Sequence, residues 1–250
     1  MNTLQDRVAL VTGSSRGIGA AIATLFANEG ARVVVHGRDA DAVETVRTQI
    51  EATGARVMSA IADLTRYDEI EGMRDRIEQV HGPVDILVAN AGGSPSRPGP
   101  IEEISEEAWR ASVDANLTAT FLTIKCFLTG MKERGRGNVI TMSSAAARCP
   151  NPGSPIAYAA AKAGIELQGR RRANRAPRRS GQLHRAGNDH DRSQPAADPR
   201  AGTGNATRHP SHPPTRHPRR RRPNGPVPRP DNSAWISGIV IDVAGGSVLL

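Results

Sequence analysis

Short apolar runs rich in β-branched residues alternate with amphipathic stretches over the first two thirds of the chain. Nearly apolar strands that alternate with helices indicate a parallel sheet covered on both faces and joined by right-handed crossovers. The pattern therefore predicts an α/β fold with a doubly wound parallel sheet. The expected strands are Val8–Thr12, Arg32–His36, Arg56–Ala60, Ile86–Ala89 and Asn138–Met142, and the expected helices lie near Ile18–Glu29, Asp41–Thr53, Glu69–His81, Glu106–Arg134 and Ala157–Leu167.

Three glycines, Gly13, Gly17 and Gly19, lie between the first expected strand and the first expected helix. Glycine is required where the backbone turns sharply and where a pyrophosphate approaches without a Cβ in the way. The free N–H groups of the following helix then face the phosphates. A glycine triplet alone could be an ordinary turn, but its place between strand and helix favours a dinucleotide site.

The spacing of this loop resembles that of the short-chain dehydrogenase/reductase family, and further matches follow in order. They are Asp63-Leu64, Asn90-Ala91-Gly92, Asn116, Ser143-Ser144 and Tyr158-Ala-Ala-Ala-Lys162, and together they cover about residues 7–167. The resemblance implies a single Rossmann-type domain over residues 1–250, a nicotinamide-dependent oxidoreductase similar to 3-oxoacyl-ACP reductases, and no metal.

The resemblance also implies the site residues. Asp63 would contact the adenine, Asn90 would hold the end of its strand beside the cofactor, and Lys162 would bond the nicotinamide ribose. Ser144 is preferred to Ser143 because it aligns with the second serine of the family's pair. The implied catalytic set is Asn116, Ser144, Tyr158 and Lys162, and the implied cofactor set is Gly13, Ser15, Arg16, Gly17, Ile18, Gly19, Arg38, Asp63, Leu64, Asn90, Ala91, Gly92, Tyr158 and Lys162.

The tyrosine and lysine have a chemical reason to stand four residues apart. Reduction of a carbonyl needs a proton for the developing alkoxide, which a neutral tyrosine can donate, whereas the reverse reaction needs the tyrosinate. Tyr158 and Lys162 share one helical face, so that the cation can stabilise this anion. Taken alone, a tyrosine and a lysine at this spacing are usually two exposed side chains without a functional role. Their place after a matching cofactor loop favours catalysis.

The second expected strand decides the preferred cofactor. It ends in His36-Gly37-Arg38, without the acidic residue that would bond a ribose 2′-hydroxyl. A basic residue there accepts a 2′-phosphate instead, and Arg16 in the glycine loop could reach the same group. Asp39 is interpreted as a helix cap. NADP(H) is therefore preferred, and NAD(H) stays open if Arg38 is merely solvated.

The positive charge of the chain belongs to one segment. Residues Gln168–Pro230 contain 16 Arg, no Lys, three Asp and no Glu, so their formal net charge is +13. Because the whole chain has a net charge of +8, the other residues together carry −5. They also hold 11 of the 18 prolines and only two large aliphatic residues, Leu183 and Val227. A segment of this composition buries too little apolar surface to offset the conformational entropy that the chain loses on folding. This segment is therefore not expected to form its share of the sheet.

The ends on either side of this segment still fit the family, because Gly238–Asp242 matches its final strand at the right distance. We infer two compensating frameshifts, near Gln168 and near Pro230. The residues Gly181–Asp191 can be encoded so that reading one base later gives Val-Asn-Cys-Ile-Ala-Pro-Glu-Thr-Ile-Met, which resembles the family's sixth strand and proline turn.

Partners and location follow from the same features. The expected reaction is the reduction of a ketone or 3-oxoacyl group, or the reverse oxidation, on a small-molecule substrate. Alternatives are an inactive or cofactor-binding-only product of a frame-shifted gene, and a basic protein that binds nucleic acid; the latter is disfavoured because the basic segment lacks aromatic residues for base stacking. The resemblance implies a homo-oligomer, a dimer or a tetramer. Two isolated cysteines and no long apolar run predict a cytoplasmic protein without a membrane span.

Overall fold

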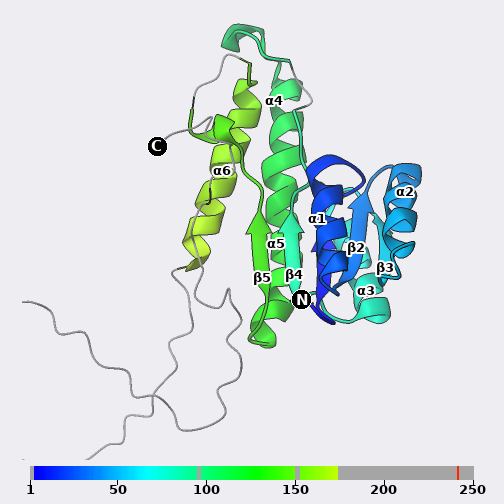
Figure 1. Cartoon of the computed structure of the whole chain (residues 1–250). Coiled ribbons are helices and arrows are strands. Elements are labelled where there is room, and N and C mark those ends of the chain that lie inside the picture. Colours follow the sequence, from blue (N-terminus) through cyan, green and yellow to red (C-terminus); the bar gives the residue numbers. More distant parts are fainter. Residues whose placement is uncertain (1–2, 95–96, 150–152, 174–240, 242–250) are drawn as a thin grey trace, which may run out of the picture. The chain divides into compact units, whose positions relative to one another are not determined.

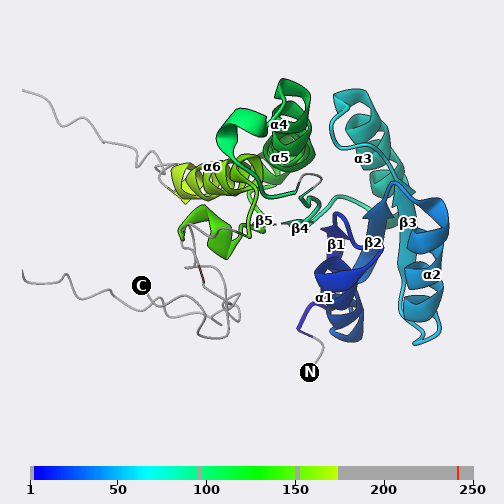
Figure 2. The same cartoon turned by 90° about the horizontal axis from the view of Figure 1, so that it is seen from above.

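Five parallel strands form the sheet in the residues that the structure describes. The structure is a computed structural model that describes residues 3–94, 97–149, 153–173 and 241, all of which belong to one compact unit of the chain. Figure 1 shows the sheet with its helices, and the order across the sheet is β3-β2-β1-β4-β5 (Figure 2). The strands are β1 (Val8–Val11), β2 (Arg32–Gly37), β3 (Val57–Ile61), β4 (Ile86–Ala89) and β5 (Asn138–Thr141).

The strand order reverses beside β1, and this reversal positions the site. The chain passes from β1 outward to β2 and β3, then returns to the other side of β1 for β4 and β5. In register, Val11 at the end of β1 pairs with Val35 of β2 and Val88 of β4. Ligands of open parallel sheets bind beyond the carboxyl ends of the strands at such a switch point.

Alternate residues of the strands bury themselves against helices on opposite faces. Leu10 of β1 packs with α3 (Tyr67–His81) and α5 (Ala119–Glu133), whereas its neighbour Val11 packs with α1 (Gly17–Asn28) and α2 (Ala40–Glu51). Figure 2 shows the two helical layers. The predicted doubly wound α/β fold, known as the Rossmann fold, is confirmed in the described residues.

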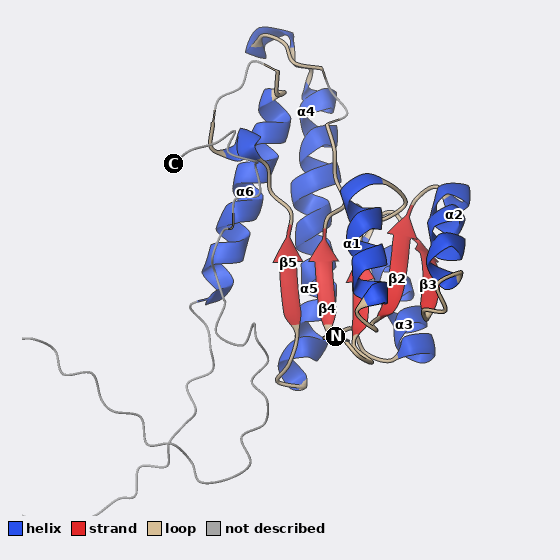
Figure 3. Cartoon of the chain, viewed as in Figure 1, coloured by secondary structure: helices blue, strands red, loops and turns tan. Residues whose placement is uncertain are grey.

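The expected long helix at 106–134 is present as one continuous helix (Figure 3). It consists of α4 (Glu106–Val113), a π-helical turn at Asp114–Thr118 and α5. The turn inserts one residue into the α-helical repeat, which sequence periodicity did not reveal. Such π-turns are frequently found at functional sites.

Helix α6 (Ile156–Ala173) extends past its predicted end at Leu167. The expectation that helical structure ends before Gln168 was therefore wrong by one and a half turns. Propagating an existing helix adds one hydrogen bond for each residue fixed, and Gln, Arg and Ala are good helix formers. The rest of the segment to Pro230, and the expected strand Gly238–Asp242 apart from Ile241, lie outside the described residues.

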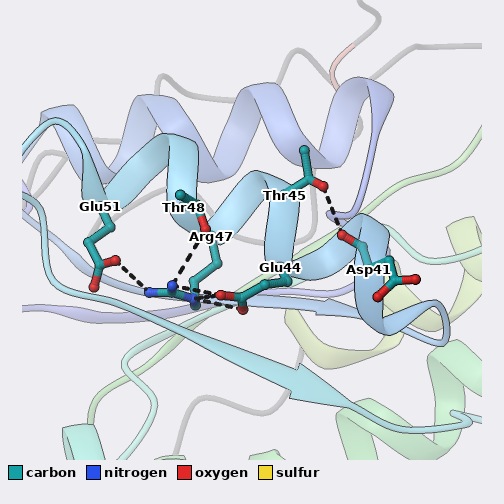
Figure 4. A network of polar contacts seen from close by, with 6 residues as sticks. All are labelled: Asp41, Glu44, Thr45, Arg47, Thr48 and Glu51. Carbon is teal, nitrogen blue, oxygen red and sulfur yellow. Dashed lines mark hydrogen bonds and ion pairs between the residues drawn. The ribbon is translucent and has the colours of Figure 1, made fainter.

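The exposed face of α2 carries a cluster of charged side chains (Figure 4). Arg47 donates hydrogen bonds to Glu44 and pairs with Glu51, with 2.9 Å between Nη1 and Oε2. These contacts join side chains three and four residues apart, which are neighbours on a helix. The glutamates are largely exposed, so the solvent screens the ion pairs and they contribute little to stability.

Candidate active site

The loop between β1 and α1 is held close to the end of β4. Asn90 donates from Nδ2 to the carbonyl oxygens of Thr12 (2.9 Å) and Gly13 (3.0 Å). Gly13 has φ +63°, and a Cβ on it would lie 2.7 Å from the Cα of Ala91. A Cβ on Gly19 would lie 2.4 Å from the carbonyl oxygen of Gly13. Both positions thus need glycine for the approach of the loop to its neighbours.

The N-terminus of α1 is suited to an anion. Arg16 is its N-cap, no side chain caps the first turn, and no acidic residue lies in that turn. The unpaired N–H groups and the helix dipole favour a negative charge here. Arg16 and Arg38 both line the adjoining cavity. The donor set and the charges therefore fit a dinucleotide phosphate.

His36 joins three elements beneath this loop. Its ring is buried, Nδ1 accepts a hydrogen bond from the Gly13 N–H (3.1 Å), and Nε2 lies 3.2 Å from the Ala62 carbonyl oxygen. Both contacts are satisfied when the ring is neutral and carries its proton on Nε2. Burial, together with the nearby Arg38 charge, lowers the pKa of His36 to about 4, although the hydrogen bond with Ala62 and the charge of Asp63 act in the opposite direction.

Residues near β3 and α2 form the part of the cavity expected to hold the adenosine. The Asp63 carboxylate accepts hydrogen bonds from the Thr65 amide (2.9 Å) and hydroxyl (2.8 Å), and these bonds, with the charge of Arg38, lower the pKa of Asp63. Asp39 caps α2 by accepting from the Ala42 N–H (3.1 Å), as predicted. Arg38 is thereby the basic residue that the cavity wall presents at the end of β2.

Asn116 lies in the π-turn and is fully buried. Its Oδ1 accepts from the Gly93 N–H (3.1 Å), and its Nδ2 donates to the carbonyl oxygens of Gly93 and Ser112, each at 2.8 Å. The side chain therefore fixes the chain that leaves β4 against the π-turn.

Tyr158 and Lys162 lie on successive turns of α6 and both line the cavity. Lys162 Nζ stands 5.6 Å from the centre of the Tyr158 ring and donates to the Met142 carbonyl oxygen at 2.9 Å. Burial lowers the pKa of Lys162 to about 8.

The two serines after β5 occupy different surroundings. Ser143 lines the cavity, and its single hydroxyl proton is shared between the Lys162 carbonyl oxygen (2.9 Å from Oγ) and Glu166 Oε1 (3.3 Å from Oγ). Ser144 caps the short 3-10 helix Ala145–Ala147, where its hydroxyl accepts from the Ala146 N–H at 3.2 Å. The hydroxyl of Ser144 therefore keeps its proton for another acceptor.

One open cavity of about 700 Å³ brings most of the predicted residues together. Its volume lies in the range of sites for cofactors and small ligands. Gly17, Asn116 and Ser144 are not part of its wall, whereas His36, Thr65 and Met142 are wall residues that sequence reasoning missed. Of the two serines weighed in the sequence, Ser143 lines the cavity and Ser144 does not. The predicted residues in the wall are Gly13, Ser15, Arg16, Ile18, Gly19, Arg38, Asp63, Leu64, Asn90, Ala91, Gly92, Tyr158 and Lys162.

Comparison with known proteins identifies the family. The family model for short chain dehydrogenases matches residues 7–176. The chain belongs to the short chain dehydrogenase family. The proteins of this family are oxidoreductases that use NAD or NADP.

Relatives of this short chain dehydrogenase are known in sequence and in structure. It is 35% identical over 164 residues to gluconate 5-dehydrogenase of Gluconobacter oxydans, a match over 66% of this chain and 63% of the relative. It is 36% identical over 162 residues to a hydroxy(phenyl)methylsuccinyl-CoA dehydrogenase subunit of Thauera aromatica, covering 65% and 64%. The match thus spans less than two thirds of either relative.

A metagenomic short-chain oxidoreductase, solved in complex with NADP, matches with a TM-score of 0.64 and 37% identity over 68% of this chain and 76% of that one. A short-chain type dehydrogenase/reductase from Mycobacterium marinum matches with a TM-score of 0.65 and 31% identity, covering 68% and 69%. In the described part of this short chain dehydrogenase, no helix is long and apolar enough to cross a membrane, and no cluster of three or more His, Cys, Asp or Glu side chains could hold a metal ion.

Proposed function

We propose that this short chain dehydrogenase uses NADP(H) to reduce a ketone or 3-oxoacyl group to a secondary alcohol, or catalyses the reverse oxidation. The observation that carries the proposal is that one cavity is lined both by Tyr158 and Lys162 and by the arginine-flanked N-terminus of α1. A basic anion site and a proton donor beside a cation are the two requirements of nicotinamide-dependent carbonyl reduction.

The cofactor, when bound, supplies or accepts the hydride. Tyr158 donates a proton from its hydroxyl to the substrate oxygen in the direction of reduction. Lys162 stabilises the resulting tyrosinate through its charge. By the resemblance to the family, Ser144 would donate a hydrogen bond to the same substrate oxygen, and Asn116 fixes the backbone at Gly93, which lines the cavity.

The preference for NADP(H) rests on two cations. Arg16 and Arg38 line the cavity, and Asp39, the nearest acid after β2, is engaged in capping α2. An arginine recognises a phosphate through several charge-assisted hydrogen bonds. The 2′-phosphate of NADP would thus meet Arg38, whereas the Asp39 carboxylate is already bonded to the Ala42 N–H of α2.

We also propose that the protein assembles as a homo-oligomer through α4, α5 and α6. Trp109 of α4 and Phe121 of α5 are large side chains left 40% and 48% exposed. Aromatic side chains are enriched at protein interfaces. Light scattering coupled to gel filtration should give a mass above that of one chain, and a monomer at micromolar concentration would refute the assembly.

The proposed reaction is tested by replacing the proton donor. Tyr158→Phe should lower kcat on the order of 100-fold to 10,000-fold, because it removes general acid catalysis. NADPH binding should persist, since the ring remains in place. Turnover is measured as the loss of reduced nicotinamide with a simple ketone and with a 3-oxoacyl thioester.

Tyr67→Phe is the matched control, because Tyr67 lies at the start of α3, where Lys125 Nζ stands 4.6 Å from its ring, and is not part of the cavity wall. This variant should keep the activity of the parent protein. Equal turnover by the two tyrosine variants would show that Tyr158 is not the proton donor.

A further inference from the structure

The loop that follows β5 is fastened to α6 by contacts on both sides of Ser144. Before it, the Met142 carbonyl oxygen accepts from Lys162 Nζ, and the Ser143 hydroxyl donates to the Lys162 carbonyl oxygen, each at 2.9 Å. After it, Arg148 reaches back to the same helix. Ser144 itself makes its contact within the loop, so its place depends on these neighbours.

The Glu166 carboxylate on α6 accepts hydrogen bonds from two side chains of this loop. Its Oε1 accepts from Ser143 Oγ at 3.3 Å, and Arg148 Nε lies 3.1 Å from Oε1 and 3.2 Å from Oε2. The side chains of Arg148 and Glu166 are only 16% and 14% exposed. Charges that are this deeply covered are retained when they are paired and hydrogen-bonded, and breaking such a pair is costly.

The position of Glu166 on the helix connects this clamp to the proposed chemistry. Tyr158, Lys162 and Glu166 are spaced by four residues, so they lie along one side of α6. The same side therefore carries the proton donor, the cation and the carboxylate that holds the loop. A shift of the loop along α6 would move Ser144 relative to Tyr158.

We propose that Glu166 is a positioning residue that, through Ser143 and Arg148, fixes the loop carrying Ser144 against the catalytic helix. This inference rests on the proposed function. It also assigns separate roles to the two serines: the Ser143 hydroxyl is used inside the protein, and Ser144 is the one directed by the clamp. The cofactor loop around Gly13 is held by Asn90 and His36 instead.

The test compares Glu166→Gln with Glu51→Gln. Both substitutions neutralise a helix glutamate paired with an arginine, but Glu51 lies on α2, is 58% exposed and pairs with Arg47 away from the cavity (Figure 4). E166Q should lower kcat roughly 10-fold to 100-fold, because misplacement of a catalytic group by about 1 Å has an effect of this size. The Kd for NADPH should stay that of the parent protein, and E51Q should change neither value.

A purely structural role predicts a different pattern. In the double variant Arg148→Met/Glu166→Leu, an apolar pair replaces the ion pair, a change that often preserves or raises stability. We expect this variant to regain the urea midpoint of the parent protein while kcat stays low. Recovery of kcat together with stability would overturn the positioning role, as would parental kcat in E166Q.

The outcome is separable from that of the proposed function. The parent protein and E166Q could both reduce carbonyls at the same rate while Tyr158→Phe shows no turnover. In that case the proposed function stands and only the role of Glu166 fails. If the parent protein shows no turnover, the proposed function fails, and the clamp is then judged by amide hydrogen exchange. E166Q should speed exchange in residues 143–149 relative to E51Q, and equal exchange would refute the clamp.

Discussion

Acidification should destabilise the fold through His36. The folded ring is held neutral because it is buried and lies near the Arg38 charge, so its pKa is about 4 instead of 6.5. In this state Nδ1 accepts a hydrogen bond from the Gly13 N–H. Between these values the unfolded chain binds a proton that the folded chain does not. Stability is therefore fully present above about pH 6.5 and decreases as the pH falls toward about 4.

The size of the effect follows from the two pKa values. Linkage gives a loss of roughly 2 kcal/mol in the free energy of unfolding on going from about pH 7.5 to about pH 5, from this one side chain. His36→Asn offers a comparison, since its amide oxygen can still accept from Gly13 and does not titrate. Leaving the Ala62 carbonyl oxygen unpaired should cost about 1–3 kcal/mol at every pH.

Urea unfolding followed by circular dichroism at a series of pH values measures both proteins. Groups such as His81 and the carboxylates contribute equally to the two curves, so the difference between them reports His36. That difference should be largest near neutral pH and should shrink by roughly 2 kcal/mol as the pH falls to about 5. If the two curves instead run parallel, His36 is charged in the folded protein or does not make the contacts described.

Three further predictions concern Arg38, the glycine Gly19 of the cofactor loop and the catalytic lysine. Arg38→Asp should shift the ratio of kcat/KM for NADPH over NADH by about 10-fold or more toward NADH, because the phosphate loses a cation and meets a like charge; an unchanged ratio would exclude Arg38 as the reader of the ribose. Gly19→Ala should lower the urea midpoint, because its Cβ would lie 2.4 Å from the Gly13 carbonyl oxygen, whereas Gly72→Ala, with open space around it in α3, should raise stability by about 0.5–1 kcal/mol; the reverse order would contradict the loop geometry. For carbonyl reduction, kcat/KM should fall as the pH rises through about 8, where Lys162 loses its charge, and a flat profile would show that this charge is not required.

Much of the cofactor site could be predicted because its signals are local. The turn at Gly13, the cap at Asp39 and the ends of the strands each depend on a few neighbouring residues. His36 was missed because its contacts join β2 to two other loops that are distant in sequence. For the same reason nothing marked Glu166, whose partners precede it by 18 and 23 residues.

Local sequence patterns predicted the catalytic part of the site and the helices around it less completely. Tyr158 and Lys162 were assigned from the ordered set of motifs that resembles the family, because their helical spacing alone does not distinguish a catalytic pair from two surface residues. The π-turn escaped notice because a single extra residue barely disturbs the apolar repeat of residues 106–134. The end of α6 was misplaced because composition after Leu167 argued against burial, although burial is not needed to lengthen a helix by a few residues.

The π-turn has a consequence for how insertions and deletions act on this chain. Each residue of an α-helix advances the chain by about 100°. The extra residue between α4 and α5 therefore determines the direction in which Trp109 points around the helix axis, relative to the buried side of α5 that contains Phe127. Deleting one residue from Asp114–Thr118 would leave a regular helix of nearly unchanged composition, but would rotate α4 by about a quarter turn and turn Asn116 away from Gly93. The π-turn thus fixes the rotation of α4 about its own axis relative to the buried helix α5.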